Sequence, residues 1–394
     1  PSDWLPTSVK EMKARGWDYV DVVIMSGDAY VDHPSFGAAV IGRVLEGAGY
    51  RVAIVPQPNW QDDLRDFRKF GRPRLFFGVS AGAMDSMVNH YTANRRRRSD
   101  DAYTPDGRHG MRPDYPTVVY SDILRKLYPD VPIIAGGIEA SLRRLSHYDY
   151  WQDKLRPSIL TECSADMLLY GMGEHNTVEL ARRLDAGERI ADITDLPQSV
   201  VLRPLSEMPS ASDDHNIILS PWEVVIKDKK AQSANFRHIE QQSNAMDGGA
   251  TLWQATGDVA VKVNPMLPAM TGHEIDAAFD LPFTRLPHPR YKGKRIPAYD
   301  MIRHSVNLHR GCFGGCAFCT ISAHQGKFIA SRSPESIMRE VKQVCRMPDF
   351  KGYISDLGGP SANMYGMHGK NLDICRKCRK PSCLHPVVCP NLNT

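Results

Sequence analysis

The sequence predicts an α/β fold whose N-terminal half is a doubly wound parallel sheet covered by helices. Short β-rich apolar runs alternate with helical patterns over about the first 200 residues, which is typical of strands joined by crossover helices. Glycines follow several of these runs, at the place where parallel strands end and ligands bind. The chain of 394 residues, 42% of them hydrophobic, can fill the cores of two or three domains.

The strands of the first domain are expected where β-branched and aliphatic residues cluster, at residues 21–25, 51–55, 75–78, 132–135 and 166–170. Helical patterns fit between them, for example over residues 37–45 and 177–184. We therefore predict a Rossmann-like domain over residues 1–203. The ligand-binding edge of its sheet would carry Gly27, Gly78, Gly136, Gly137 and Gly171.

Residues 204–296 are predicted to form a less regular connecting segment. A helical stretch near residues 227–245 and a strand pair around residues 251–263 are its regular elements. Residues 281–295 are rich in proline and in basic residues, and repeated proline favours an extended chain. We expect this part to run along a surface between domains.

Residues 297–394 begin with a strand–loop–helix pattern. Residues 305–308 form a short apolar–polar run that can be a strand ending near Gly311. Ser333 is a suitable N-cap with Pro334 at the first helical position, so a helix should begin there. A second strand is expected at residues 352–356, followed by the pair Gly358 and Gly359.

The loop between this first strand and the helix contains Cys312, Cys316 and Cys319, with Phe318 directly before the last cysteine. Thiolates are the preferred ligands of iron–sulfur clusters, and a 4Fe-4S cluster normally takes four of them. Three local thiolates would leave one iron open to another ligand. A structural zinc site, or reduced cysteines without a metal, is the alternative interpretation.

The C-x3-C-x2-C spacing with its aromatic residue resembles that of radical S-adenosylmethionine (SAM) enzymes, and the chain is similar to the YgiQ-type radical SAM proteins. The matching stretches are residues 80–94, 98–105, 136–144, 324–326 and 331–333. This resemblance implies a 4Fe-4S cluster on Cys312, Cys316 and Cys319. Such a cluster would cleave SAM reductively to a 5′-deoxyadenosyl radical that acts on an unknown substrate.

The resemblance also implies that Phe318, Gly358 and Gly359 lie at the bound SAM, and that a flavodoxin or a ferredoxin donates the electron. Residues 297–394 would be the N-terminal part of a radical SAM (β/α) barrel with a Cys-rich insertion. Such a barrel needs six βα units of about thirty residues each, and residues 305–394 have room for only two. We therefore expect the chain to be the N-terminal portion of a longer protein.

The N-terminal domain resembles the cobalamin-binding domains that precede the barrel in one branch of radical SAM enzymes. Those domains carry an Asp-x-His-x-x-Gly loop after the first strand. Here Asp32 and His33 are adjacent, and Gly37 comes one residue late. We therefore do not expect cobalamin, and we interpret His33 as a polar residue of a loop or of a substrate site.

A second group of cysteines near the end of the chain has the spacing C-x2-C-x4-C-x5-C. It comprises Cys375, Cys378, Cys383 and Cys389. Four thiolates this close together indicate a metal site, and both zinc and an iron–sulfur cluster use such a set. His385 could replace one of the cysteines. Basic residues that would offset the charge of the site are Arg376, Lys377, Arg379 and Lys380.

Composition narrows the class of protein. No run of about eighteen apolar residues predicts a membrane helix. The nine cysteines are mostly clustered, which indicates metal ligation in a reducing compartment, the cytoplasm. The formal net charge of +4 is too small by itself to indicate nucleic-acid binding. The four arginines at 95–98 form either a solvated loop with local ion pairs or a contact with RNA or a phosphorylated substrate.

The sequence therefore favours an enzyme that generates a carbon-centred radical from SAM. The alternative is a non-catalytic binding or scaffold protein that depends on zinc or an iron–sulfur cluster and could associate with RNA.

Overall fold

The computed structural model describes residues 3–360 and 362–393, which form two compact units. The first unit comprises Pro1–Leu202 and Leu281–Met301, and the second comprises Arg203–Asp280 and Ile302–Thr394. The two units differ from the three segments expected from the sequence. The boundaries of those three segments stay predictions. Among the described residues, no helix is long and apolar enough to cross a membrane.

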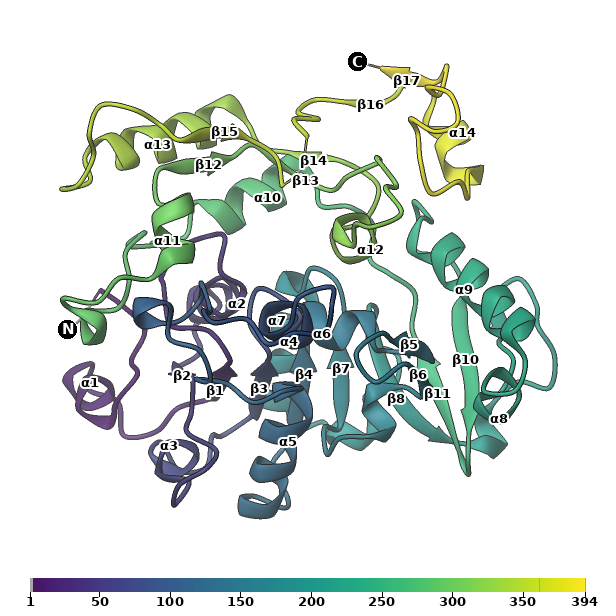
Figure 1. Cartoon of the computed structure of the whole chain (residues 1–394), viewed down its shortest axis with the longest axis horizontal. Helices are drawn as coiled ribbons and strands as arrows, with labels where there is room; N and C mark the ends of the chain where they lie inside the picture. The colour runs from purple at the N-terminus through teal and green to yellow at the C-terminus, as the bar shows by residue number, and fades with distance from the viewer. Residues whose placement is uncertain (1–2, 361, 394) are drawn as a thin grey trace. The chain divides into compact units, whose positions relative to one another are not determined.

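The first unit is built on a mainly parallel sheet (Figure 1), and its strands follow the order β2-β1-β3-β4-β7-β8. They are β1 (Val22–Ser26), β2 (Val52–Pro56), β3 (Phe76–Ser80), β4 (Ile133–Gly136), β7 (Met167–Leu169) and β8, which begins in this unit (Ser199–Pro204). All pairs from β2 to β7 are parallel, and β8 is antiparallel to β7. The predicted α/β class with a parallel N-terminal sheet is confirmed.

Helices cover both faces of this sheet. Every residue of β1 and β2 is therefore buried. On one face, Val23 and Val55 pack with Tyr120 of α5 (Pro116–Leu127) and Phe67 of α3 (Arg65–Arg68). On the other face, Ile24 and Ile54 lie against Gly42 of α2 (Gly37–Gly47), where an added Cβ would approach both side chains. Alternate residues of the strands thus face opposite helix layers, as a doubly wound sheet requires.

Shorter elements complete the first unit. Its other helices are α1 (Val9–Ala14), α4 (Ser86–His90), α6 (Gly137–Leu142), α7 (Glu174–Asp185) and α11, which extends to the unit boundary (Pro297–Ile302). A two-stranded antiparallel sheet joins β5 (His147–Asp149) and β6 (Lys154–Arg156). The 3₁₀ turns are η1 (Pro105–Gly107), η2 (Ile159–Thr161), η3 (Ile190–Asp192) and η5 (Pro289–Tyr291).

The proline-rich stretch belongs to the first unit because its backbone pairs with the loop after β1. Asp32 N donates to Leu286 O at 3.1 Å, and Arg285 N donates to Asp32 O at 2.8 Å. The side chains of Arg285 and His288 are buried. This part of the chain therefore packs into a unit, whereas the sequence suggested that it runs along a surface.

The first half of the second unit contains three paired strands, η4 (Leu205–Glu207) and three helices. β10 (Thr251–Thr256) is antiparallel to β11 (Val259–Val263) and parallel to β9 (Asn216–Ile218). The helices are α8 (Trp222–Val225), α9 (Lys229–Ser243) and α10 (Gly272–Phe279). The predicted helix near 227–245 and strand pair within 251–263 are present at these positions.

The second half of this unit holds the predicted strand–loop–helix–strand pattern. β12 (Ser305–Asn307) pairs in parallel with β15 (Asp356–Gly358), and α13 (Pro334–Cys345) lies between them in the sequence, capped by Ser333. The second strand therefore begins at the end of the predicted 352–356 run. Gly352 has a φ of 87°, a left-handed conformation that a pleated strand does not accommodate.

The remaining elements of the second unit are short. β13 (His309–Arg310) pairs with β14 (Ala330–Ser331), and β16 (His368–Gly369) pairs with β17 (Leu392–Asn393), both antiparallel. The helices are α12 (Ile321–Gln325) and α14 (Leu372–Lys377). The three cysteines of the first group therefore lie in a loop, whereas in the second group Cys375 lies in α14 and the other three follow it.

Candidate functional site

The three-cysteine loop, residues 312–319, follows β13 through a glycine that the backbone requires. Gly311 has a φ of 93°, and a Cβ there would lie 2.2 Å from Phe328 O. Only glycine fits this close approach. The chain therefore turns sharply after β13 and places Cys312 at the start of the loop, where it is 7% exposed.

Gly314 separates the first two sulfur atoms of this loop. A Cβ on Gly314 would lie 3.4 Å from Cys312 Sγ and 3.6 Å from Cys316 Sγ, so both sulfurs border the space that the missing side chain leaves open. Gly314 N donates to Cys312 Sγ at 3.5 Å, and Cys319 N donates to Cys316 O at 3.0 Å in a tight turn. Thiols, an open space and a backbone donor to sulfur fit an iron–sulfur cluster.

The other residues assigned to SAM by resemblance occupy different environments. Phe318 is 90% exposed, and Cys316 beside it in the loop is exposed too. Gly358 ends β15 and is buried, with its carbonyl accepting a 2.7 Å hydrogen bond from Leu308 N. The structure therefore places Gly358 beside the strand that leads into the three-cysteine loop, while Phe318 projects outward.

His309 is a residue of this site that the sequence did not single out. A Cβ on Gly359 would lie 2.0 Å from His309 Nε2, so the imidazole packs directly on the glycine. His309 is buried, and burial lowers the pKa of its imidazole. Met364 N donates to Nε2 at 2.9 Å, which holds the ring in position. A single histidine in a strand carries no sequence pattern that would reveal this contact.

The four-cysteine loop, residues 375–389, packs on the three-cysteine loop. Cys383 N donates to Phe313 O at 3.0 Å, and Ser382 Oγ donates to Gly314 O at 2.8 Å. A Cβ on Gly315 would lie 2.8 Å from Pro381 O. One apolar cluster contains Cys312 and Phe313 together with Cys383 and Cys389. The two loops therefore form one packed body within the second unit.

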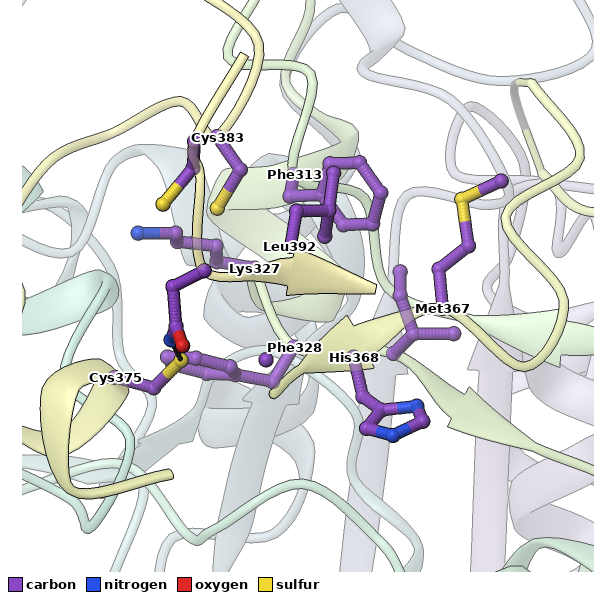
Figure 2. Close-up of a pocket in the computed structure, with 12 residues that line it drawn as sticks. Phe313, Lys327, Phe328, Met367, His368, Cys375, Cys383 and Leu392 are labelled. Carbon is purple, nitrogen blue, oxygen red and sulfur yellow. Dashed lines mark hydrogen bonds between the residues drawn. The ribbon is translucent and has the colours of Figure 1, made fainter. Parts of the chain in front are cut away.

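A cavity of about 40 Å³ lies inside this body (Figure 2). Its walls are mostly apolar and include Phe313, Phe328, Ile329, Met367 and Leu392. Three cysteines of the second group also line it, namely Cys375, Cys383 and Cys389. His385, the alternative ligand, is exposed and does not line the cavity.

Lys327 brings a positive charge to these sulfurs, as Figure 2 shows beside Cys375 and Cys383. It is 2% exposed, and its Nζ donates to Cys378 Sγ at 3.5 Å and to Lys380 O at 2.6 Å. Burial raises the pKa of the Cys375 and Cys383 thiols, and the Lys327 ammonium opposes that rise. Asn391 Nδ2 also donates to Cys375 Sγ, at 3.4 Å.

Within each group the cysteines are near one another, but their sulfur atoms do not have the arrangement of metal ligands. Among residues 3–360 and 362–393, no group of three or more His, Cys, Asp or Glu side chains is placed so that it could hold a metal ion. All nine cysteines carry free thiols. The ligand roles of both cysteine groups therefore remain proposals.

In the first unit, three of the family-matching stretches meet in a buried ionic network. Arg112 donates to Asp28 Oδ1 at 2.7 Å and to Asp101 Oδ2 at 2.9 Å, with all three side chains at least 95% buried. Arg143 pairs with Asp85, and Glu139 accepts hydrogen bonds from the backbone N–H groups of Ser86 and Thr117. Stretches 80–94, 98–105 and 136–144 thus help to hold the loops at the carboxyl edge of the sheet.

His33 and the arginine run also lie in this unit. His33 is buried, its Nδ1 accepts from Ser35 N at 3.1 Å, and burial together with the Arg285 charge holds its pKa well below the usual value. The four arginines at 95–98 are exposed. Arg95 lies 3.7 Å from Asp153 and stacks over Tyr150, as a solvated loop with local ion pairs would.

Comparison with known proteins identifies the class. Residues 4–305 match the family model described as "Radical SAM N-terminal", and the chain belongs to that family. It is 66% identical over 392 residues to a UPF0313 protein of Porphyromonas gingivalis, covering 100% of this chain and 62% of the relative. A UPF0313 protein of Methanocella arvoryzae is 50% identical over 384 residues, covering 97% of this chain and 63% of the relative. The predicted membership of the YgiQ-type group is confirmed.

The chain therefore spans somewhat over six tenths of the length of these relatives. The radical SAM methyltransferase TsrM of Kitasatospora setae, solved with cobalamin and a [4Fe-4S] cluster bound, aligns with a TM-score of 0.43 and 16% identity. This alignment covers 82% of the present chain and 45% of TsrM.

One expectation needs correction here. The sequence analysis did not expect cobalamin, because the loop around Asp32 and His33 lacks the Asp-x-His-x-x-Gly spacing. The TsrM structures contradict this expectation, since the matched protein holds cobalamin together with its cluster. The expectation that cobalamin is absent is therefore withdrawn.

Proposed function

We propose that this chain contains the cluster-binding region of a radical SAM enzyme, with Cys312, Cys316 and Cys319 as the cluster ligands. Family membership supports the class of enzyme. The observation that carries the assignment of residues is that Gly314 leaves an open space bordered by the sulfurs of both Cys312 and Cys316. A 4Fe-4S cluster bound there would supply the electron that cleaves the sulfonium of SAM.

The residues of the chain have separate tasks in this proposal. Gly311 and Gly314 give the loop its sharp turn and its open space, so that three thiolates can approach one cluster. Gly359, which packs on the His309 ring, would bind the amino group of SAM together with Gly358, as the family resemblance implies. Phe318, which is 90% exposed, would shield bound SAM from water. The substrate and the reaction on it belong to the whole protein.

Cluster binding is tested by anaerobic reconstitution of the full-length protein with iron and sulfide. We expect about four irons for this site and an absorption band near roughly 400 nm from thiolate-to-iron charge transfer, bleached by dithionite. Alanine at Cys312, Cys316 or Cys319 should remove both. Cys345→Ala is the matched control, because Cys345 is an exposed free thiol at the end of α13, outside both loops. Equal iron and absorbance in all four variants would contradict the assignment.

A further inference from the structure

We propose that Cys375, Cys378, Cys383 and Cys389 bind a single zinc ion, and that this zinc site holds the three-cysteine loop in place. The first observation is that three of the four cysteines line one cavity and that the fourth lies near its wall. Cys375, Cys383 and Cys389 line it, and Cys378 Sγ lies 3.5 Å from Lys327, another lining residue. Residues spread over a stretch of loop therefore present their sulfurs to one small volume.

The buried side chain of Lys327 places a positive charge close to these sulfurs. Lys327 is 2% exposed, and within residues 3–360 and 362–393 its ammonium donates hydrogen bonds to Cys378 Sγ and Lys380 O and pairs with no carboxylate. Burying an ammonium costs several kcal/mol unless electronegative groups surround it. The Cys378 sulfur and the Lys380 carbonyl oxygen contact Lys327, and its charge acts on the Cys375 and Cys383 thiols, so this pocket favours an arrangement of negative thiolates and positive charge.

The size and donors of the pocket favour one ion over a cluster. A cavity of about 40 Å³ accommodates about three water-sized particles, whereas a 4Fe-4S cube contains eight atoms. Zinc takes four thiolates in tetrahedral geometry. A zinc tetrathiolate carries two negative charges, which the hydrogen bonds from Lys327 to Cys378 and from Asn391 to Cys375 would offset.

The four-cysteine loop has little else to hold it together. The segment that contains this loop, residues 368–393, has as its regular structure only α14, which has six residues, and the two-residue strands β16 and β17. Large apolar side chains of this segment remain exposed, namely Leu372, Ile374, Leu384, Val387 and Val388. A segment that buries so little apolar surface needs a metal or another cross-link for its order.

The contacts between the loops transmit this order to the three-cysteine loop. Cys383, a ligand in this proposal, donates through its own N–H to Phe313 O, and Ser382 Oγ donates to Gly314 O. Zinc binding would fix the backbone of 382–383 and thereby Phe313 and Gly314, which lie between Cys312 and Cys316. This bracing role rests on the proposed function of the three-cysteine loop, whereas the zinc site itself does not.

The zinc site is tested on full-length protein in which Cys312, Cys316 and Cys319 are all replaced by serine, so that the first site cannot contribute metal. We expect about one zinc per chain by elemental analysis, lost when Cys375 and Cys378 are also changed to serine and retained when Cys345 is changed instead. Iron with acid-labile sulfide in place of zinc would overturn the proposal. An unchanged metal content in the Cys375→Ser/Cys378→Ser variant would overturn it too.

Bracing is tested on the wild-type protein, which avoids a variant that fails to fold. Zinc is released with a high-affinity chelator, which leaves the thiols of Cys312, Cys316 and Cys319 unmodified, and hydrogen exchange is followed before and after release. We expect at least tenfold faster exchange of the Cys383 amide and of residues 312–316 after release, with strand β1 unchanged as the internal control. If exchange in 312–316 stays the same although zinc has left, the bracing role is wrong while the proposed function stands.

Discussion

Cys383 donates its backbone N–H to the carbonyl oxygen of Phe313 at 3.0 Å, which joins two cysteine groups that lie far apart in the sequence. Phe313 follows Cys312 directly, so this bond connects a proposed ligand of one site to the neighbour of a proposed ligand of the other. Substitutions in either loop should therefore affect the other loop.

Gly314→Ala should block cluster assembly without unfolding the protein. The new methyl group would occupy the space between Cys312 Sγ and Cys316 Sγ, at 3.4 Å and 3.6 Å. We expect iron uptake during reconstitution to fall at least fivefold, with an unchanged far-ultraviolet circular dichroism spectrum. Gly37→Ala is the matched control, because a Cβ there meets nothing within 4 Å. If Gly314→Ala binds as much iron as the wild type, the cluster does not use the space beside Gly314.

Gly359→Ala should destabilise the second unit through His309. The added Cβ would lie 2.0 Å from Nε2 of a buried ring, and such overpacking costs about 1–3 kcal/mol. The free energy of unfolding from urea titration measures the loss. Adding His309→Ala to Gly359→Ala should recover part of it, because the clash disappears. Equal stability of Gly359→Ala and the wild type would mean that the contact is absent in solution.

Arg332→Met should be strongly destabilising. Arg332 is 1% exposed, pairs with the buried Glu340, and donates to Ser336 Oγ at 2.8 Å. Removing one partner of a buried ion pair costs about 3–5 kcal/mol, because the other charge stays buried. Arg339→Met on α13, the helix that carries Glu340, serves as the control, since the Arg339 side chain is exposed where it pairs with Asp280. Unfolding midpoints in urea that fall equally in both variants would contradict this interpretation.

His147 should make the first unit less stable in mild acid. Burial lowers the pKa of His147 from 6.5 to about 4, so the folded protein resists protonation that the unfolded chain accepts. Its contribution is fully present above pH 6.5 and is lost as the pH falls toward 4. The loss is at most about 3 kcal/mol. His147→Asn should show a smaller fall in thermal unfolding midpoint between pH 7 and pH 5, and an identical fall would exclude His147 as the cause.

The sequence predicted the first sheet well because its strands are buried on both faces. The runs at 21–25 and 51–55 match β1 and β2 to within one residue at each end. β15 was placed too early because it is a three-residue strand with two exposed residues, which leaves no apolar pattern. β8 was missed because its antiparallel pairing breaks the alternation of strands and helices.

Spacing alone located both cysteine groups, since thiolates that share a metal must be close in the chain or be brought close by the fold. The contact between the groups could not be predicted, because hydrogen bonds such as Ser382 to Gly314 join backbone positions without any residue pattern. Lys327 was missed for a related reason, because a single lysine is normally a surface residue, and only its burial beside Cys378 sets it apart.

The most direct test of the central claim is the amount of 5′-deoxyadenosine that the reconstituted full-length protein forms from SAM under dithionite, measured by chromatography and mass spectrometry. The proposed function predicts more than one 5′-deoxyadenosine per chain for the wild type and for Cys345→Ala. It predicts at least a hundredfold less for Cys312→Ala, Cys316→Ala and Cys319→Ala. Undiminished 5′-deoxyadenosine formation in any one of these three variants, or none in the wild type with its cluster assembled, would contradict it.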